Sequence, residues 1–271
     1  MKLPLLVENG EEDAAAHRKK APMKLPCSAL NVGPDITLYH TGPALDYGPL
    51  PSFFYFSISG PDSLMLDPFN QPVQFLHGEM IRVFSMTLPG HENGLPAKEA
   101  MSLWAEDISK GIDCVGDFLE KAKMAIDFAI REKFVNPHKM ATGGLSRGGF
   151  IAAHLAARDE RFRFLLGFAP LTKLGRIKEF HGMKENTLVR SLDLTHLSHP
   201  LSNRHVRLYI GNQDTRVGTH ECFEFAMSLV EHKKQAQVEL FITPSIGQMG
   251  HGTPPEIFQQ GAQWIAKSIS L

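Results

Sequence analysis

The sequence predicts an α/β protein with a mainly parallel sheet and helices on both faces. Two observations indicate this class. Short β-rich runs alternate with longer stretches of helical periodicity, which is the pattern of a covered parallel sheet. A composition of 43% hydrophobic and 21% charged residues is typical of a globular chain. At 271 residues the chain is long enough to build one large core.

The expected elements begin after an N-terminal arm. Residues 1–25 are charged and alanine-rich, with little apolar periodicity, so we expect an arm that is either helical or flexible, followed by one domain over 26–271. Gly111 and Gly116 are expected to break or bend the longest helical stretch. Strands are predicted at 36–39, 53–58, 81–85, 139–142, 164–168, 206–210 and 238–242, and helices at 73–78, 97–134, 150–158, 220–233 and 255–268.

The segment over 171–203 is longer than an ordinary connection between two strands. It carries apolar residues, among them Leu174, Ile177 and Phe180, between charged ones. We predict a small helical cap inserted here that partly covers a site at the end of the preceding strand. An ordinary connecting helix with a long surface loop is the alternative.

A G-x-S-x-G pattern over 144–148 lies between a predicted strand and a predicted helix, with Ser146 at its centre. In this setting the pattern indicates a nucleophilic serine on a tight turn. Glycine neighbours let the strand and the helix approach closely because they have no Cβ atom. The alternative is a glycine-rich connector with an incidental serine.

Two further residues complete a candidate catalytic set. A serine hydroxyl is a weak nucleophile, so it requires a histidine to take its proton and an acid to orient that histidine. Asp214 follows the predicted strand 206–210, and His251 follows the predicted strand 238–242. Each residue alone is a weak signal, but together they have the order Ser, Asp, His that acyl transfer uses on such folds. The sequence therefore predicts acyl transfer through Ser146, His251 and Asp214.

The oxyanion of such a reaction requires hydrogen-bond donors aimed at it in advance. The backbone N–H of Arg147 is the first expected donor, and an N–H of Ser59 or Gly60 is the second. A plain turn over 59–62 is the alternative for the latter. The Arg147 guanidinium either attracts an anionic substrate group or is an ordinary surface charge. His91 either lines the entrance of the site or belongs to a turn.

These motifs resemble those of the α/β-hydrolases, in particular the dienelactone-hydrolase-like and prolyl-oligopeptidase-like branches. The segment 210–217, Ile-Gly-Asn-Gln-Asp-Thr-Arg-Val, is similar to their acid-bearing region, and 88–92, Leu-Pro-Gly-His-Glu, is similar to the loop after their fourth strand. The resemblance covers about residues 50–271. Ser59-Gly60 stands where these families commonly have His-Gly after the third strand.

The expected function is therefore that of a serine hydrolase acting on a carboxylic ester or thioester. We prefer this substrate class because the chain has no room for the large substrate-gating domain of the prolyl-oligopeptidase-like peptidases. A small serine peptidase or amidase is the alternative, with Arg147, Asp62 and Glu92 as candidates for holding a peptide terminus. A catalytically silent binding protein is a third reading.

The net charge and the cysteine content limit the classes of partner and the compartment that we expect for this chain. A net charge of −1 predicts no nucleic acid partner, and no apolar run approaches a membrane span. The acidic stretch near the start argues against a signal peptide, and the three cysteines Cys27, Cys114 and Cys222 fit reduced thiols. We therefore expect a cytoplasmic protein with a small-molecule or short-peptide substrate. We expect no metal and no organic cofactor, because acyl transfer through Ser146, His251 and Asp214 needs neither. The close pair His196 and His199 lacks a metal-ligand pattern. The oligomeric state is not predicted.

Overall fold

The computed structural model describes residues 26–232 and 237–270, and it confirms the predicted class. One eight-stranded sheet has the order β1-β2-β4-β3-β5-β6-β7-β8. The strands from β4 to β8 in this order are parallel, whereas β2 is antiparallel to both β1 and β4. The predicted N-terminal arm lies outside the described residues.

The seven predicted strands are all present, and one strand was missed. The strands are β1 (Ser28–Gly33), β2 (Ile36–Thr41), β3 (Leu50–Phe56), β4 (Arg82–Ser85), β5 (Val135–Leu145), β6 (Phe162–Phe168), β7 (His205–Gly211) and β8 (Gln237–Thr243). The missed strand is β1, which forms a hairpin with β2 at the sheet edge. Its only apolar contacts with the core come from Leu30 and Val32, so its sequence carries a weak strand signal.

A helix is present in each predicted helical stretch, but the first of the described helices was not predicted, and the expectation for one of the two glycines needs correction. The helices are α1 (Gly60–Met65), α2 (Gln71–Phe75), α3 (Ala100–Ser109), α4 (Cys114–Arg131), α5 (Arg147–Arg158), α6 (Thr187–Ser191), α7 (Ser198–Leu201), α8 (Thr219–His232) and α9 (Pro255–Ser270). The long stretch 97–134 divides after α3, where Gly111 has a φ of 80°. Gly116 does not interrupt a helix, contrary to the prediction. It lies in the first turn of α4, and its amide donates to the capping carboxylate of Asp113 at 2.7 Å.

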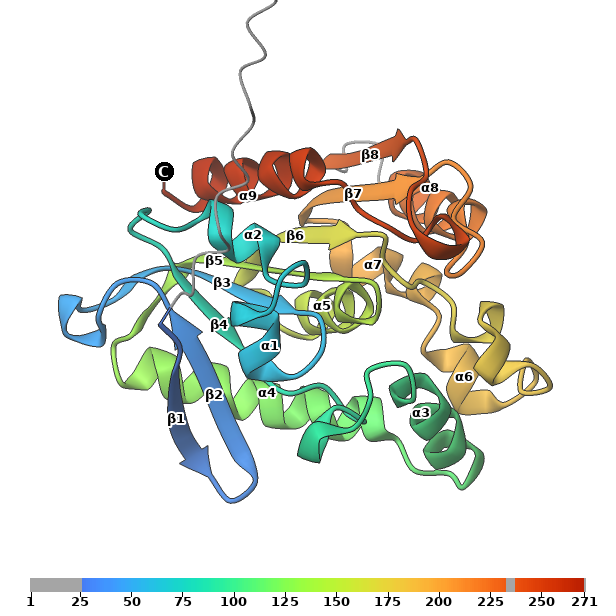
Figure 1. The fold of residues 1–271 in the computed structure, drawn as a ribbon, viewed down its shortest axis with the longest axis horizontal. Coiled ribbons are helices and arrows are strands. Elements are labelled where there is room, and N and C mark those ends of the chain that lie inside the picture. Colours follow the sequence, from blue (N-terminus) through green and yellow to red (C-terminus); the bar gives the residue numbers. More distant parts are fainter. Residues whose placement is uncertain (1–25, 233–236, 271) are drawn as a thin grey trace, which may run out of the picture.

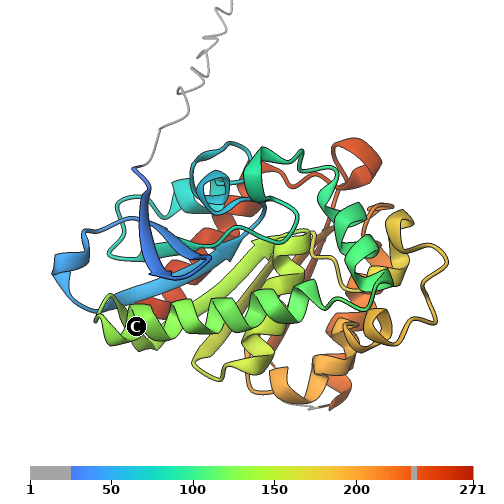
Figure 2. The same ribbon diagram turned by 90° about the horizontal axis from the view of Figure 1, so that it is seen from below.

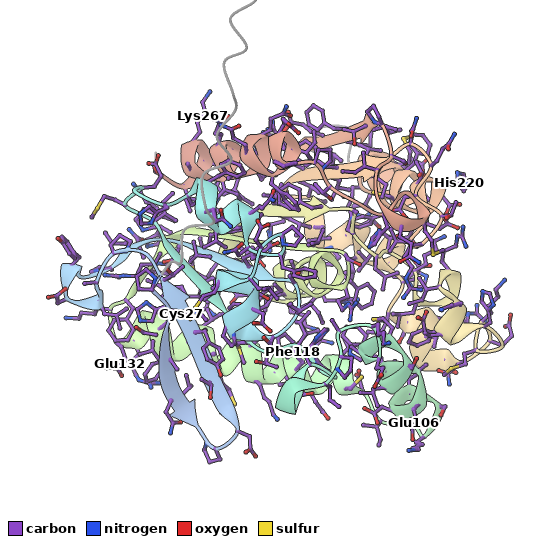
Figure 3. All side chains as sticks on the ribbon, in the orientation of Figure 1. Cys27, Glu106, Phe118, Glu132, His220 and Lys267 are labelled. Atoms are coloured by element: carbon purple, nitrogen blue, oxygen red, sulfur yellow. The ribbon has the colours of Figure 1, made fainter. Side chains whose placement is uncertain are left out.

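The sheet is covered on both faces, as Figures 1 and 2 show. Helices α4, α5 and α8 pack on one face, and α2 and α9 pack on the other. Strand β3 illustrates how the sequence produces two cores. Phe54 and Phe56 face the first layer of helices, whereas Phe53 and Tyr55 face the second, because successive side chains of a strand point to opposite faces. Charged side chains such as Glu106, Glu132 and Lys267 lie on the exterior (Figure 3).

The segment over 171–203 consists of short helical pieces rather than one long helix. It contains three 3-10 turns, η3 (Leu174–Arg176), η4 (Lys178–Phe180) and η5 (Leu194–Leu197), together with α6 and α7. The buried side chains of Leu174, Ile177 and Phe180 join the core on the α5 face of the sheet. This segment also contacts α3 and α8. Its role as a cap stays a prediction.

The parallel strands direct their carboxyl ends to one edge of the sheet, which is where such folds place their chemistry. Ser146 directly follows β5, whereas the loops that carry Asp214 and His251 follow β7 and β8. Within the described ranges, no helix is both long enough and apolar enough to cross a bilayer.

Candidate active site

Ser146 occupies a sharp turn between β5 and α5. Its backbone has φ 56° and ψ −118°, a conformation that non-glycine residues rarely adopt. The turn is fixed by hydrogen bonds on both sides. Ser146 N donates to Phe168 O at 2.9 Å, and Ser146 O accepts from Leu171 N at 3.1 Å. A Cβ atom on Gly148 would overlap with Phe56 O of the adjacent strand, so the pattern around Ser146 requires glycine there.

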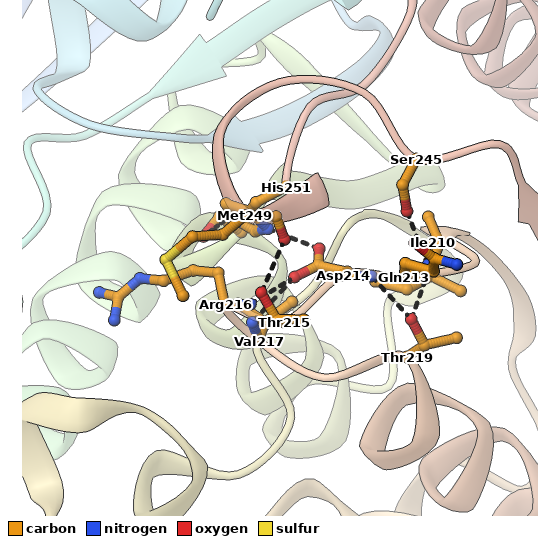
Figure 4. Close-up of polar contacts among 12 residues, drawn as sticks. Ile210, Gln213, Asp214, Thr215, Arg216, Val217, Thr219, Ser245, Met249 and His251 are labelled. Atoms are coloured by element: carbon orange, nitrogen blue, oxygen red, sulfur yellow. Dashed lines mark hydrogen bonds and ion pairs between the residues drawn. The ribbon is translucent and has the colours of Figure 1, made fainter.

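The three residues predicted as a catalytic set lie in hydrogen-bond contact. His251 Nε2 lies 2.9 Å from Ser146 Oγ. On the other side of the ring, His251 Nδ1 lies 2.7 Å from Asp214 Oδ2 (Figure 4). The structure thus brings together side chains that are 105 and 37 positions apart in the sequence. A serine hydroxyl and a carboxylate, each within 3 Å of one of the two nitrogens of the same imidazole, are the geometry that serine acyl transfer uses.

The loop after β7 holds the Asp214 carboxylate in one orientation. Asp214 is 3% exposed, and its Oδ1 accepts from the amides of Arg216 and Val217, each at 3.0 Å. Its own amide donates to Thr219 Oγ1 at 3.0 Å, which fixes the start of the loop (Figure 4). With Oδ1 occupied, Oδ2 is the oxygen that remains for the imidazole.

The loop that carries His251 is tied to the acid loop. Thr215 N donates to Met249 O at 2.9 Å, and Thr215 Oγ1 donates to the same carbonyl at 3.1 Å (Figure 4). Gly250 has a φ of 71°, and a Cβ atom on it would overlap with Gln213 O. The histidine and the aspartate are therefore positioned by a shared backbone contact as well as by their own hydrogen bond.

The three predicted oxyanion donors differ in what they already bind. Arg147 is the first residue of α5, where a backbone N–H has no acceptor within the helix. The amide of Gly60 donates to Thr87 Oγ1 at 3.0 Å. Ser59 caps α1, and its Oγ accepts from Asp62 N at 3.2 Å. Residues 59–62 therefore begin a helix, in place of the plain turn that was considered.

The side chain of Arg147 contacts His91, a pairing that no sequence pattern indicates. Its Nη1 donates to Ala97 O at 2.7 Å and lies 2.9 Å from His91 Nε2. His91 is buried, and this burial together with the Arg147 charge lowers the pKa of its imidazole to about 4. The ring is therefore neutral near pH 7 and can accept the arginine N–H.

A small cavity of about 60 Å³ lies beside the candidate nucleophile. Its lining includes the predicted site residues Ser146, Arg147 and His251, and Leu171 and Ile177 from the predicted cap. Arg216 and Val217 were detectable because they follow Asp214, but nothing in the sequence indicates Met101 as a neighbour. Asp62 and Glu92, the other candidates for holding a peptide terminus, do not line it, and Glu92 borders a separate cavity. The lining residues are Met101, Ser146, Arg147, Leu171, Ile177, Arg216, Val217 and His251.

In the described part of the chain, no cluster of three or more His, Cys, Asp or Glu side chains has the arrangement of a metal site. The Asp214 side chain contacts His251, and the His251 side chain contacts both Asp214 and Ser146.

The mostly parallel sheet, the helices on both faces and the sharp turn at Ser146 define the chain as an α/β-hydrolase, as the sequence predicts. The model of the prolyl oligopeptidase family matches residues 104–269, which is more than half of the chain. The chain therefore belongs to the prolyl oligopeptidase family, and it is a hydrolase.

Solved structures with the same fold include proteins of very different length. A cold-adapted esterase from an Arctic intertidal metagenomic library matches with a TM-score of 0.66 and 18% identity, over 97% of this chain and 100% of that one. TT1662 from Thermus thermophilus matches with a TM-score of 0.66 and 18% identity, over 92% and 100%. A puromycin-hydrolyzing peptidase from Mycobacterium tuberculosis matches with a TM-score of 0.66 and 17% identity, over 91% of this chain but only 40% of its own length. None of the curated proteins matches the chain.

Proposed function

We propose that the chain hydrolyses a carboxylic ester or thioester, with Ser146 as nucleophile, His251 as general base and Asp214 as the residue that orients the base. One observation carries the proposal. Two successive hydrogen bonds, of 2.9 Å and 2.7 Å, connect Ser146 Oγ through the imidazole to the buried Asp214 carboxylate. A serine hydroxyl in this environment can lose its proton as it attacks a carbonyl carbon.

The reaction would proceed in two steps. His251 Nε2 takes the proton of Ser146 as Oγ attacks the carbonyl carbon, and Asp214 stabilises the resulting imidazolium. The tetrahedral intermediate then collapses, the alcohol or thiol leaves with the proton from His251, and an acyl-enzyme forms. In the second step a water molecule gives its proton to His251 and attacks the acyl carbon. Release of the acid returns the proton to Ser146 Oγ.

The negative charge of the intermediate would be held by backbone amides. We assign the first donor to the N–H of Arg147, at the start of α5. The amide of Gly60 already donates to Thr87 Oγ1, and the amides of Ser57 and Ile58 donate to Ser63 Oγ. This occupancy favours the amide of Ser59 over that of Gly60 as the second donor.

The size of the cavity beside Ser146 supports an ester or thioester with a small acyl group. About 60 Å³ holds a few heavy atoms, whereas a peptide requires room for side chains on both sides of the scissile bond. Membership of the prolyl oligopeptidase family favours the second candidate, a small serine peptidase or amidase. The predicted cap over 171–203 contributes Leu171 and Ile177 to the cavity lining, which supports a role for this segment in shaping the pocket.

The test compares hydrolysis of p-nitrophenyl acetate, butyrate and octanoate with hydrolysis of dipeptide p-nitroanilides. Wild type, Ser146→Ala and a control variant, Ser109→Ala, are assayed, and all three are labelled with a fluorophosphonate probe. Ser109 is an exposed residue of α3. Ester turnover and labelling that vanish only in Ser146→Ala support the proposal. Turnover of the anilides alone would favour the peptidase. Folded protein with neither labelling nor turnover would favour a silent binding protein.

A further inference from the structure

The cavity beside Ser146 is lined by apolar residues and by two arginines. The apolar residues are Met101, Leu171, Ile177 and Val217, and the arginines are Arg147 and Arg216. We call this cavity the arginine pocket. An apolar wall suits methylene groups, and a guanidinium suits a carboxylate, so its composition is that of a site for a short chain with an anionic end.

One of the two arginines is neutralised within the protein. Arg216 forms a two-pronged ion pair with Glu179, with Nη1 to Oε2 at 2.7 Å and Nη2 to Oε1 at 2.9 Å. The Glu179 side chain is 8% exposed and the Arg216 side chain 21%. Because this carboxylate is bound at both oxygens, it is not available to a substrate ammonium group.

Arg147 has no such partner. Its Nη1 binds Ala97 O and His91 Nε2, and both are neutral acceptors. Among the residues that the structure describes, no carboxylate forms an ion pair with Arg147, whereas the lining residues Arg216 and His251 contact Glu179 and Asp214, respectively. A guanidinium has five N–H donors, so both contacts at Nη1 leave the Nε and Nη2 donors for another acceptor.

Arg147 therefore carries a positive charge that no carboxylate contacts directly, in a partly buried site. The Glu179 carboxylate is bound by Arg216, and the Asp214 carboxylate is bound by His251 and by the amides of Arg216 and Val217. Burying a charge without a counter-charge is costly, and a bound anion would remove that cost. Burial is the main cause that lowers the pKa of Arg147 to about 10, with the Arg216 charge acting in the same direction and the Glu179 charge opposing.

We propose that the arginine pocket binds a carboxylate of the substrate, and that the preferred substrate is a short ester or thioester whose acyl part ends in a carboxylate. This inference rests on the proposed function, since it places the acyl group beside Ser146. The methylene groups of the acyl part pack against Leu171 and Ile177. The Arg147 side chain binds the carboxylate, and the neutral imidazole of His91 orients that side chain.

The test uses two substrates of nearly equal shape, monomethyl succinate and its neutral amide, methyl succinamate. Methanol release is measured for both at pH 8, and p-nitrophenyl acetate serves as an uncharged reference. A charge-assisted hydrogen bond predicts a kcat/KM about 10- to 100-fold higher for monomethyl succinate. In Arg147→Gln we expect this ratio to fall to about one. The exposed Arg190, which pairs with exposed Glu185, supplies the control variant Arg190→Gln, in which the ratio should be retained.

The ratio of the two kcat/KM values distinguishes loss of carboxylate binding from a general loss of activity, because a misplaced Ser146 would slow hydrolysis of both esters equally. If Arg147→Gln does not fold, wild-type protein provides the second measurement. Succinate should inhibit p-nitrophenyl acetate hydrolysis competitively at concentrations where succinamate does not. Equal kcat/KM values for the two esters in an enzyme that hydrolyses p-nitrophenyl acetate would overturn the inference and leave the proposed function standing. Absence of fluorophosphonate labelling would remove both.

Discussion

Ser146 has a backbone conformation that costs free energy, and the residues around it maintain that conformation. A non-glycine residue at φ 56° and ψ −118° is strained by about 1–3 kcal/mol. The strain is compensated by the hydrogen bonds to Phe168 and Leu171 and by the close approach of α5 to β3 at Gly148. Arg147 follows Ser146 at the start of α5, where its amide has no acceptor within the helix, so the strained turn places the proposed nucleophile next to the proposed oxyanion donor.

Gly148→Ala tests this close approach. The new methyl group would overlap with the backbone oxygen of Phe56, and a backbone atom of a central strand cannot move without disturbing the sheet. We expect a loss of about 1–3 kcal/mol in the free energy of unfolding, measured by urea denaturation, together with loss of esterase activity. Gly33→Ala is the matched control, since no atom lies within 4 Å of its new methyl group. Wild-type stability in Gly148→Ala would contradict the geometry.

The role proposed for Asp214 predicts a large effect from a small change. Asn at this position keeps the size and the acceptor for the amides of Arg216 and Val217, but it presents an N–H donor where Oδ2 now accepts from His251. The imidazole would then carry its proton on the wrong nitrogen, and we expect kcat for ester hydrolysis to fall about 10⁴-fold. Thermal unfolding should change little by comparison. A fall of less than 10-fold would show that another group orients the base.

The residues of the site were predictable from sequence to different extents. Ser146, Asp214 and His251 could be chosen because each follows a strand-like run and their order along the chain is restrictive. The contact of His91 with Arg147 could not be chosen, because it joins a loop residue to the first residue of α5, 56 positions away. Met101 could not be predicted as a residue of the cavity lining either, since it belongs to a helix whose apolar positions all have the spacing of core residues.

At the scale of elements, the alternation of strands and helices was predictable from the sequence. One helix was missed although its N-terminal capping signal is present in the sequence. Helix α1 was missed because residues 59–62 have the composition of a turn. A signal was nevertheless present, with Ser59 at the capping position and Pro61 in the first turn. The division of 97–134 at Gly111 follows from the left-handed backbone that glycine permits, whereas Gly116 in α4 is compensated by its hydrogen bond to Asp113.

The ion pair of Glu179 with Arg216 connects two elements of the site, the 3-10 turn η4 and the acid loop after β7. Glu179→Gln removes one charge of a largely buried pair, and we expect it to lower the free energy of unfolding by about 1.5–3 kcal/mol. The matched control is Glu185→Gln, whose carboxylate is 91% exposed and pairs with exposed Arg190 at 3.4 Å. That change should alter stability by less than about 1 kcal/mol. Urea denaturation of both variants makes the comparison, and equal losses would mean that the buried pair contributes no more than a surface pair.

At the scale of the whole molecule, two buried histidines link the stability of the core to pH. His154 belongs to α5 and is 3% exposed, with Nε2 at 3.1 Å from Leu192 O and its ring 4.6 Å from that of Phe150. Burial is the main cause that lowers its pKa from 6.5 to about 4, with Arg158 acting in the same direction and the Leu192 carbonyl opposing. His91 is shifted the same way. Both side chains are neutral in the folded protein at pH 7.

The direction of this shift fixes the pH dependence. Between pH 6.5 and about 4 the unfolded chain binds a proton at position 154 that the folded protein excludes, so stability is fully present above pH 6.5 and falls as the pH approaches 4. From pH 7.5 to 5.0 we expect His154 to account for a loss of about 2 kcal/mol in the free energy of unfolding. His154→Asn removes the titrating group and keeps a side-chain N–H for Leu192 O, so its loss over the same interval should be smaller by that amount. The exposed residue His138 supplies the control His138→Asn, which should follow wild type. Urea denaturation at the two pH values decides the matter, because parallel losses in wild type and His154→Asn would mean that protonation of the α5 face contributes nothing to acid sensitivity.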